Sequence, residues 1–63
     1  MKRIKELRLA KGLSQYKLAE LSATSQTRIW QWENGYYTPT LLEMDLIARA
    51  LGATVKEVFP DVE

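Results

Sequence analysis

Amide, hydroxyl and indole side chains gather between residues 26 and 34 of this 63-residue chain. Thr27, Trp30, Gln31 and Asn34 follow one another at i, i+3, i+4 and i+7, the spacing that places side chains on one face of a helix. A surface helix normally keeps charged, solvated residues on such a face. This face instead carries groups suited to hydrogen bonding and stacking, which indicates contact with another molecule.

These side chains match the edges of DNA bases. Gln26 can bind adenine through two hydrogen bonds at N7 and N6, and Thr27 can place its methyl group against the methyl of thymine. Arg28 can bind guanine through two donors or grip a phosphate. Gln31 lies one turn beyond Thr27 on the same face. The alternative for each residue is an ordinary solvated surface position.

Trp30 is the least expected residue on this face, because an exposed tryptophan is uncommon unless it binds something. One interpretation is packing against a sugar or a thymine methyl group, which would add Trp30 to the candidate base contacts. The other is stacking on Tyr36 in a surface cluster. The sequence leaves the two open.

Two short helices joined by a tight turn are predicted to position this face. The first is expected from Gln15 to about Ser22 and the second from about Gln26 to Asn34, with Ser14 and Ser25 as N-caps. Gly35 follows the second helix, where a left-handed residue commonly ends helices. The small Ala19 allows the two helices to approach closely.

Three further helices are predicted around this pair. One runs from about Lys2 to Lys11 and ends at Gly12, and another runs from Leu41 to Leu51 behind an N-cap at Thr40. Helical spacing assigns Leu42, Leu46, Ile47, Ala50 and Leu51 to the core. The sequence does not decide whether Met44 fills a gap in the core or lies exposed. Thr54 and Glu57 form a capping box that opens a last helix through Phe59. The chain is therefore expected to be all-α, with five helices in a single domain over residues 1–63.

The distribution of charge and the absence of cysteine bear on the kind of partner and on the compartment. Residues 1–31 carry seven basic and two acidic side chains, and residues 32–63 carry two basic and six acidic ones. A basic half that contains the candidate contact helix is typical of a surface that meets phosphates, although a solvated lysine-rich helix explains it equally well. No signal peptide or membrane-spanning stretch is evident. The absence of cysteine fits a cytoplasmic protein.

Catalytic and metal sites are not expected. Histidine and cysteine, the usual general base and the usual nitrogen and sulfur ligands, are absent. The serines lack a histidine partner, and Glu43 and Asp45 fall on different helix faces. We therefore predict no enzyme activity, no metal, no cofactor and no small-molecule substrate.

The chain resembles the Cro/repressor-type, or Xre, helix-turn-helix regulators, which include the lambdoid phage repressors. The motifs that carry the resemblance, in chain order, are Gly12-Leu13-Ser14-Gln15, Leu18-Ala19-Glu20, Ser25-Gln26, Ile29, Glu33-Asn34-Gly35, Pro39-Thr40-Leu41, Ile47-Ala48-Arg49-Ala50-Leu51-Gly52 and Glu57-Val58-Phe59. The resemblance covers residues 4–59 and implies a lambda-repressor-like five-helix fold with the helix-turn-helix at about residues 15–34. The turn departs from the family, with Ala23 in place of the usual glycine and Thr24 in place of an aliphatic residue. A left-handed alanine costs roughly 1 kcal/mol relative to glycine.

The resemblance also implies roles for residues outside the contact face. Ser14 and Gln15, at the positive end of a helix, are expected to contact a phosphate. Asn34, Tyr36 and Thr38 are further candidates for phosphate contacts, with Asn34 alternatively serving as a helix cap. For Tyr37, a place in the core and a DNA contact are equally good explanations.

Arg8 and Glu33 match a pair that the resembling family uses inside the domain. We expect a buried ion pair that fixes the third helix against the first. The alternative, a DNA contact by Glu33, is disfavoured because a carboxylate would repel phosphate.

Together these features predict a sequence-specific double-stranded DNA-binding regulator, expected to act as a repressor at a palindromic operator as a homodimer. The resembling repressors meet near their last helix, which suggests a contact through Ala53, Val55, Phe59 and Val62 on the side away from the N-terminal helices. The alternative for Phe59 is that it is buried in the core of its own subunit and makes no dimer contact. The rival hypothesis is a protein-interaction module of the same fold, such as an antitoxin-like or regulatory partner.

Overall fold

Five helices make up the protein in a computed structural model that describes residues 1–62. Their bounds are α1 Lys2–Ala10, α2 Gln15–Leu21, α3 Gln26–Glu33, α4 Leu41–Ala50 and α5 Val55–Val58. The predicted all-α class is confirmed, and each helix begins and ends within one or two residues of the position expected from the sequence. No strand occurs among residues 1–62. The predicted single domain also includes Glu63, which lies outside the described residues.

Side-chain caps explain where the helices begin. The hydroxyl groups of Ser14 and Ser25 accept hydrogen bonds from amides in the first turns of α2 and α3, at 2.9 and 3.2 Å. Thr54 and Glu57 form the predicted capping box at α5. Thr40 forms a second capping box with Glu43 at α4, which the sequence analysis did not identify. These bonds pair amides that a helix leaves without an internal partner.

The turn between α2 and α3 has the left-handed residue expected at Ala23, with φ of 57°. The next amide, that of Thr24, donates to the carbonyl of Ala19 at 2.9 Å and closes the turn. The hydroxyl of Thr24 is buried without a hydrogen-bond partner. The two departures from the family therefore leave backbone strain at one residue and an unpaired polar group at the next.

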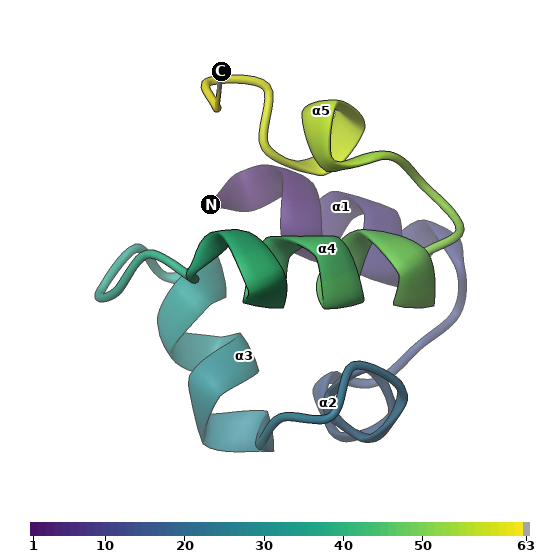
Figure 1. Cartoon of the computed structure of the whole chain (residues 1–63). Helices are drawn as coiled ribbons and strands as arrows, with labels where there is room; N and C mark the ends of the chain where they lie inside the picture. The colour runs from purple at the N-terminus through teal and green to yellow at the C-terminus, as the bar shows by residue number, and fades with distance from the viewer. Residues whose placement is uncertain (63) are drawn as a thin grey trace.

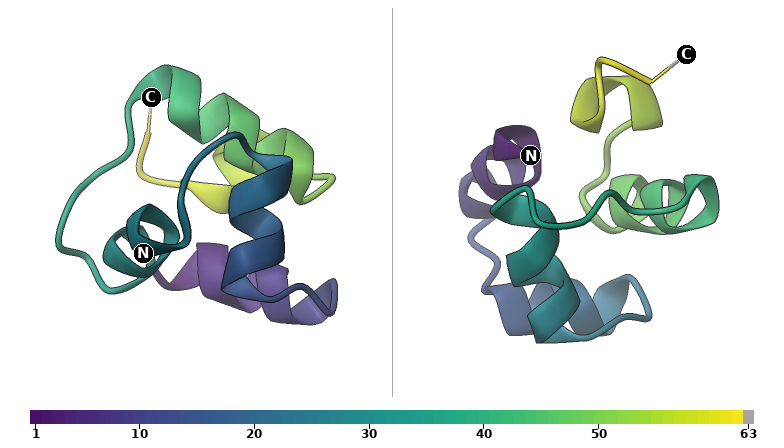
Figure 2. Two further views of the ribbon diagram at one scale, coloured as in Figure 1. Left: turned by 90° about the horizontal axis from the view of Figure 1, so that it is seen from below. Right: turned by 90° about the vertical axis from the view of Figure 1, so that its left-hand side faces the viewer.

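The helices place the helix-turn-helix at one end of the molecule. Figure 1 and the right-hand view of Figure 2 show α2 and α3 crossing at one end, with α5 and the C-terminal segment at the opposite end and α4 between them. The start of α1 lies beside the C-terminal segment, and Arg3 donates from Nε to the backbone carbonyl of Glu57 at 3.3 Å. The backbone nitrogen of Met1 donates to the carbonyls of Trp32 and Glu33, both at 3.2 Å, so α1 also holds the end of α3.

One cluster of buried side chains joins all five helices. Its members are apolar residues spaced at helical intervals: Ile4, Leu18, Ala19, Ile29, Trp32, Met44, Ile47, Ala48, Leu51, Val58 and Phe59. Met44 thus belongs to the core, which the sequence left open. Leu42 was assigned to the core and is instead 70% exposed. It lies five positions before Ile47, about 140° around the helix, and therefore points away from the buried face.

Candidate nucleic-acid interface

Helix α3 presents the side chains that the sequence singled out. Gln26, Thr27, Arg28 and Trp30 are exposed and Gln31 is half-buried, while Ile29 and Trp32 anchor the opposite face in the core. Because α2 and α3 pack against each other and α3 begins at a capped turn, the exposed face has a fixed direction. The base-contact candidates therefore form a continuous strip along one helix.

A chain of hydrogen bonds holds the start of α3 against α2. The side-chain amide of Gln26 donates to Oε1 of Gln15 at 2.8 Å, and the amide of Gln15 donates to Oε1 of Glu33 at 3.0 Å. A glutamine amide has two donor hydrogens and one acceptor oxygen. Gln26 consequently keeps one N–H and its oxygen free, which is the pair of groups that a bidentate contact with adenine needs.

The chain ends in a buried ion pair between Arg8 and Glu33. The guanidinium of Arg8 donates from Nε at 2.7 Å and from Nη2 at 3.1 Å to the two carboxylate oxygens, and its Nη1 donates to the carbonyl of Leu13 at 2.8 Å. The side chains of Arg8 and Glu33 are only 8% and 1% exposed. With bidentate geometry and a further bond from Gln15, the pair ties α1, α2 and α3 together and places the carboxylate inside the domain.

Arg28 is engaged by a residue that the sequence analysis did not assign to the site. Its Nη1 donates to Oε2 of Glu43 at 2.9 Å, while Oε1 of the same carboxylate accepts from the backbone amide of Thr40 at 2.8 Å. The backbone hydrogen bond from Thr40 is the main cause that lowers the pKa of Glu43 below its ordinary value, and Arg28 adds to it. Glu43 is therefore an anion fixed by a helix cap beside α3.

Trp30 stacks on Tyr36, with ring centroids 5.4 Å apart and planes inclined by 15°. The surface-cluster interpretation thus describes the structure, although Trp30 stays 44% exposed and one of its ring faces remains available. The side-chain amide of Asn34 donates to the carbonyl of Trp30 at 2.8 Å. Asn34 therefore serves the end of α3, as the helix-cap alternative expected, and the second hydrogen of its amide nitrogen remains free to donate.

The remaining phosphate candidates lie around α3 on two sides. Ser14 is exposed at the start of α2, and Gln15 is half-buried between α2 and α3. Tyr36 and Thr38 are exposed in the connection between α3 and α4, and Tyr37 is also exposed, so it is not a core aromatic. A cavity of about 390 Å³ lies between α3 and this connection, and its lining residues are Arg28, Gln31, Trp32, Tyr37, Thr38, Thr40 and Glu43.

The candidate dimer residues differ in their accessibility. Ala53, Val55 and Val62 are half-buried against the core, whereas Phe59 is 4% exposed and belongs to the core itself. Phe59 is therefore not available to a second copy. The C-terminal segment does not lie away from α1 as expected, because Val58 and Phe59 fill the core beside Ile4 and bring α5 against the start of α1.

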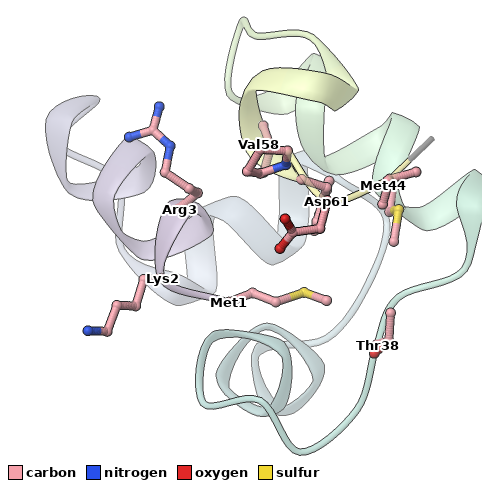
Figure 3. Close-up of a pocket in the computed structure, with 10 residues that line it drawn as sticks. Met1, Lys2, Arg3, Thr38, Met44, Val58 and Asp61 are labelled. Carbon is pink, nitrogen blue, oxygen red and sulfur yellow. The ribbon is translucent and has the colours of Figure 1, made fainter.

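An apolar cavity of about 320 Å³ opens at the end of the molecule that α5 and the C-terminal segment form (Figure 3). Its lining comes from the start of α1, from the connection between α3 and α4, from α4, from α5 and from the C-terminal segment: Met1, Lys2, Arg3, Thr38, Met44, Val58, Phe59, Pro60, Asp61 and Val62. Figure 3 shows the charged ends of Lys2 and Arg3 turned away from it. None of the base-contact candidates lines this cavity, so it is separate from the α3 face.

Two further features bear on the kind of protein. Residues 1–62 contain no group of three or more acidic, histidine or cysteine side chains placed to hold a metal ion. Within that same range, no helix has both the length and the apolar character to cross a bilayer.

Two capped helices packed through a tight turn, with amide, hydroxyl, indole and guanidinium side chains along the exposed face of the second, define a helix-turn-helix domain of the DNA-binding class. A helix-turn-helix family model matches residues 4–58, nearly the whole chain. The chain belongs to this family, in its Cro/repressor or Xre type, and is a DNA-binding helix-turn-helix regulator. Comparisons with curated proteins and with solved structures gave no significant match.

Proposed function

We propose that the protein is a repressor that occupies a palindromic operator as a homodimer, with α3 in the major groove. The observation that carries this proposal is the orientation of Gln26 by the hydrogen-bond chain through Gln15 to the buried carboxylate of Glu33. An oriented side chain loses less entropy on binding than a free one, which favours a specific contact. Gln26, Thr27 and Gln31 are the proposed base contacts, with Trp30 packing on a neighbouring sugar or methyl group.

The phosphate contacts are proposed to flank this strip. Ser14 and Gln15 lie at the start of α2, and Tyr36 and Thr38 carry hydroxyl groups on the other side of α3. Phosphate contacts fix the register of the protein on the duplex, while base contacts determine the sequence. Asn34 donates one amide hydrogen to the end of α3 and keeps a second N–H, so it stays a proposed phosphate contact.

The dimer is proposed because one eight-residue α3 covers too few base pairs to select a site. Two copies place their recognition helices one DNA turn apart, about 34–36 Å. Ala53, Val55 and Val62 are the proposed contact residues. A weak contact is sufficient, since binding to two half-sites itself contributes to association. A DNA-bound regulator of this kind is expected to work in the cytoplasm.

A selection of bound sequences from random duplex DNA tests the proposal. The wild-type protein should enrich a palindrome whose half-sites are about 10–10.5 base pairs apart. Gln26→Ala should bind the selected site more weakly by about 1–3 kcal/mol and lose preference at one base pair. Gln15→Ala should weaken binding more generally, because Gln15 contacts phosphate and also holds Gln26. Unchanged site preference in Gln26→Ala would show that α3 does not contact bases through this residue.

A protein-interaction module remains the second candidate, and one observation favours it. Leu41 and Leu42 are adjacent and 71% and 70% exposed at the start of α4. Exposed apolar side chains are typical of the centre of a protein interface. If the selection enriches no sequence, the second candidate becomes the better explanation of this surface.

A further inference from the structure

The 390 Å³ cavity between α3 and the connection to α4 is lined by one cationic and one anionic side chain, which are bound to each other. Arg28 is the only basic residue and Glu43 the only acidic residue among its lining side chains, and their ion pair measures 2.9 Å. The other lining groups include the hydroxyls of Tyr37, Thr38 and Thr40, which can donate to an anion. The cavity thus has the donors that a phosphate needs, with a carboxylate already in place.

We propose that Glu43 competes with the DNA backbone for Arg28, so that binding replaces the carboxylate with a phosphate. The inference rests on the proposed function and assigns Arg28 to phosphate rather than to guanine. In the free protein Glu43 holds the guanidinium over the cavity, and on DNA the same guanidinium turns to the phosphate. Glu43 thereby lowers the affinity for every duplex alike, because each duplex offers the same phosphates.

The geometry makes Glu43 a better competitor than an ordinary surface residue. Flexible surface pairs contribute little, since both side chains lose conformational freedom when they meet. The cap bond from Thr40 to Oε1 has already ordered the side chain of Glu43, which is 24% exposed. Only Arg28, at 61% exposure, must be ordered to form the pair.

The test measures binding of labelled duplexes, one selected and one of random sequence, to four variants at several salt concentrations. Glu43→Gln is the central variant, because glutamine can still accept the cap bond and only the charge is lost. It should bind both duplexes about two- to fivefold more tightly, the change expected when an exposed ion pair no longer has to be broken. Its melting temperature should stay close to that of the wild type.

Asp45→Asn is the matched control. It removes the same charge from the same helix and breaks the 2.9 Å ion pair with Arg49, but Asp45 does not line the cavity. Its effect on binding should be smaller than that of Glu43→Gln. Equal effects from the two variants would mean that only the net charge matters, and the proposal would be overturned.

Arg28→Gln and the double variant decide whether Glu43 acts through Arg28. Arg28→Gln should weaken both duplexes and reduce the salt slope by about one. Adding Glu43→Gln to Arg28→Gln should then bring little further gain. A full two- to fivefold gain in that background would show direct repulsion between Glu43 and DNA and overturn the proposal. A gain confined to duplexes with one particular guanine would overturn the assignment to phosphate.

These outcomes are separable from failure of the proposed function. If the wild type binds neither duplex, the DNA-binding proposal itself fails and the competition fails with it. If the wild type binds and selects a sequence while Glu43→Gln behaves like Asp45→Asn, only the competition is wrong.

Discussion

At the scale of single residues, the turn between α2 and α3 carries the clearest local penalty. Ala23 is the only non-glycine residue with a positive φ among residues 1–62. An L-residue in this conformation brings its Cβ close to the following carbonyl oxygen. The neighbouring hydroxyl of Thr24 is buried without a partner. The packing of α2 against α3 and the backbone bond from Thr24 to Ala19 therefore hold the turn against this strain.

Ala23→Gly should stabilise the protein by about 0.5–1 kcal/mol, since glycine removes the steric strain but loses more entropy on folding. For a domain of this size, that is a rise in melting temperature of about 2–8 °C. Gly12→Ala is the reciprocal control, because Gly12 has φ of 70° and nothing within 4 Å of an added Cβ. It should lose about what Ala23→Gly gains. Thermal unfolding followed by circular dichroism measures the melting temperatures of both variants. A lower melting temperature for Ala23→Gly than for the wild type would show that Ala23 is not strained in the turn.

The Arg8–Glu33 ion pair acts between helices and therefore belongs to the scale of elements. Glu33 accepts from Arg8 of α1 and from Gln15 of α2, while its own backbone ends α3. A single carboxylate thus fixes the angle at which the contact helix leaves the domain. Burial of the pair also means that neither charge can turn to water if the other is removed.

Glu33→Ala should cost about 3–5 kcal/mol, because it leaves the guanidinium of Arg8 buried and uncompensated. In so small a domain this loss approaches the whole stability. Glu6→Ala is the matched control, since Glu6 also pairs with an arginine, Arg3 at 3.3 Å, but both side chains are about half exposed. It should change stability by less than 1 kcal/mol. Urea unfolding of both variants compares them, and similar small losses would mean that the pair does not hold α3.

Local signals account for what the sequence predicted about these elements. Ser14, Ser25, Thr54 and Gly35 mark helix ends through bonds or backbone angles that involve only a few neighbouring residues. The five helices were therefore predictable to within one or two residues. Leu42 was placed wrongly because a leucine near a helix start satisfies apolar spacing without facing the core.

The site was predictable in its residue types but not in its contacts. The chain from Gln26 through Gln15 to Glu33 joins residues 11 and 18 positions apart, and Glu43 reaches Arg28 from 15 positions away. Such partners depend on how α2, α3 and α4 pack, which hydrophobic spacing does not specify. The Arg8–Glu33 pair was predicted from the resemblance to the Xre family. The sequence around Arg8 alone does not indicate which acidic residue is its partner.

At the scale of the whole molecule, the proposed DNA-binding face and the proposed dimer contact lie at different ends. The helix-turn-helix occupies one end, and α5 with the C-terminal segment occupies the other (Figure 1). The basic half of the sequence supplies α1, α2 and most of α3, and the acidic half supplies α4 and α5. The proposed DNA contacts lie within residues 14–38, and the proposed dimer contact at the C-terminal end, made by Ala53, Val55 and Val62, lies outside that range.

Val62→Glu should prevent two copies from binding one palindrome. Val62 is half-buried at the C-terminal end, and a carboxylate there would meet its own copy across a two-fold axis. Leu42→Glu is the control, because it makes the same change of charge on an exposed leucine of α4. Sedimentation with a selected palindrome should show two copies per duplex for the wild type and for Leu42→Glu, and one copy for Val62→Glu at equal protein concentration. If Leu42→Glu loses the second copy instead, the contact lies on α4. A wild type that binds as one copy per palindrome removes the dimer altogether.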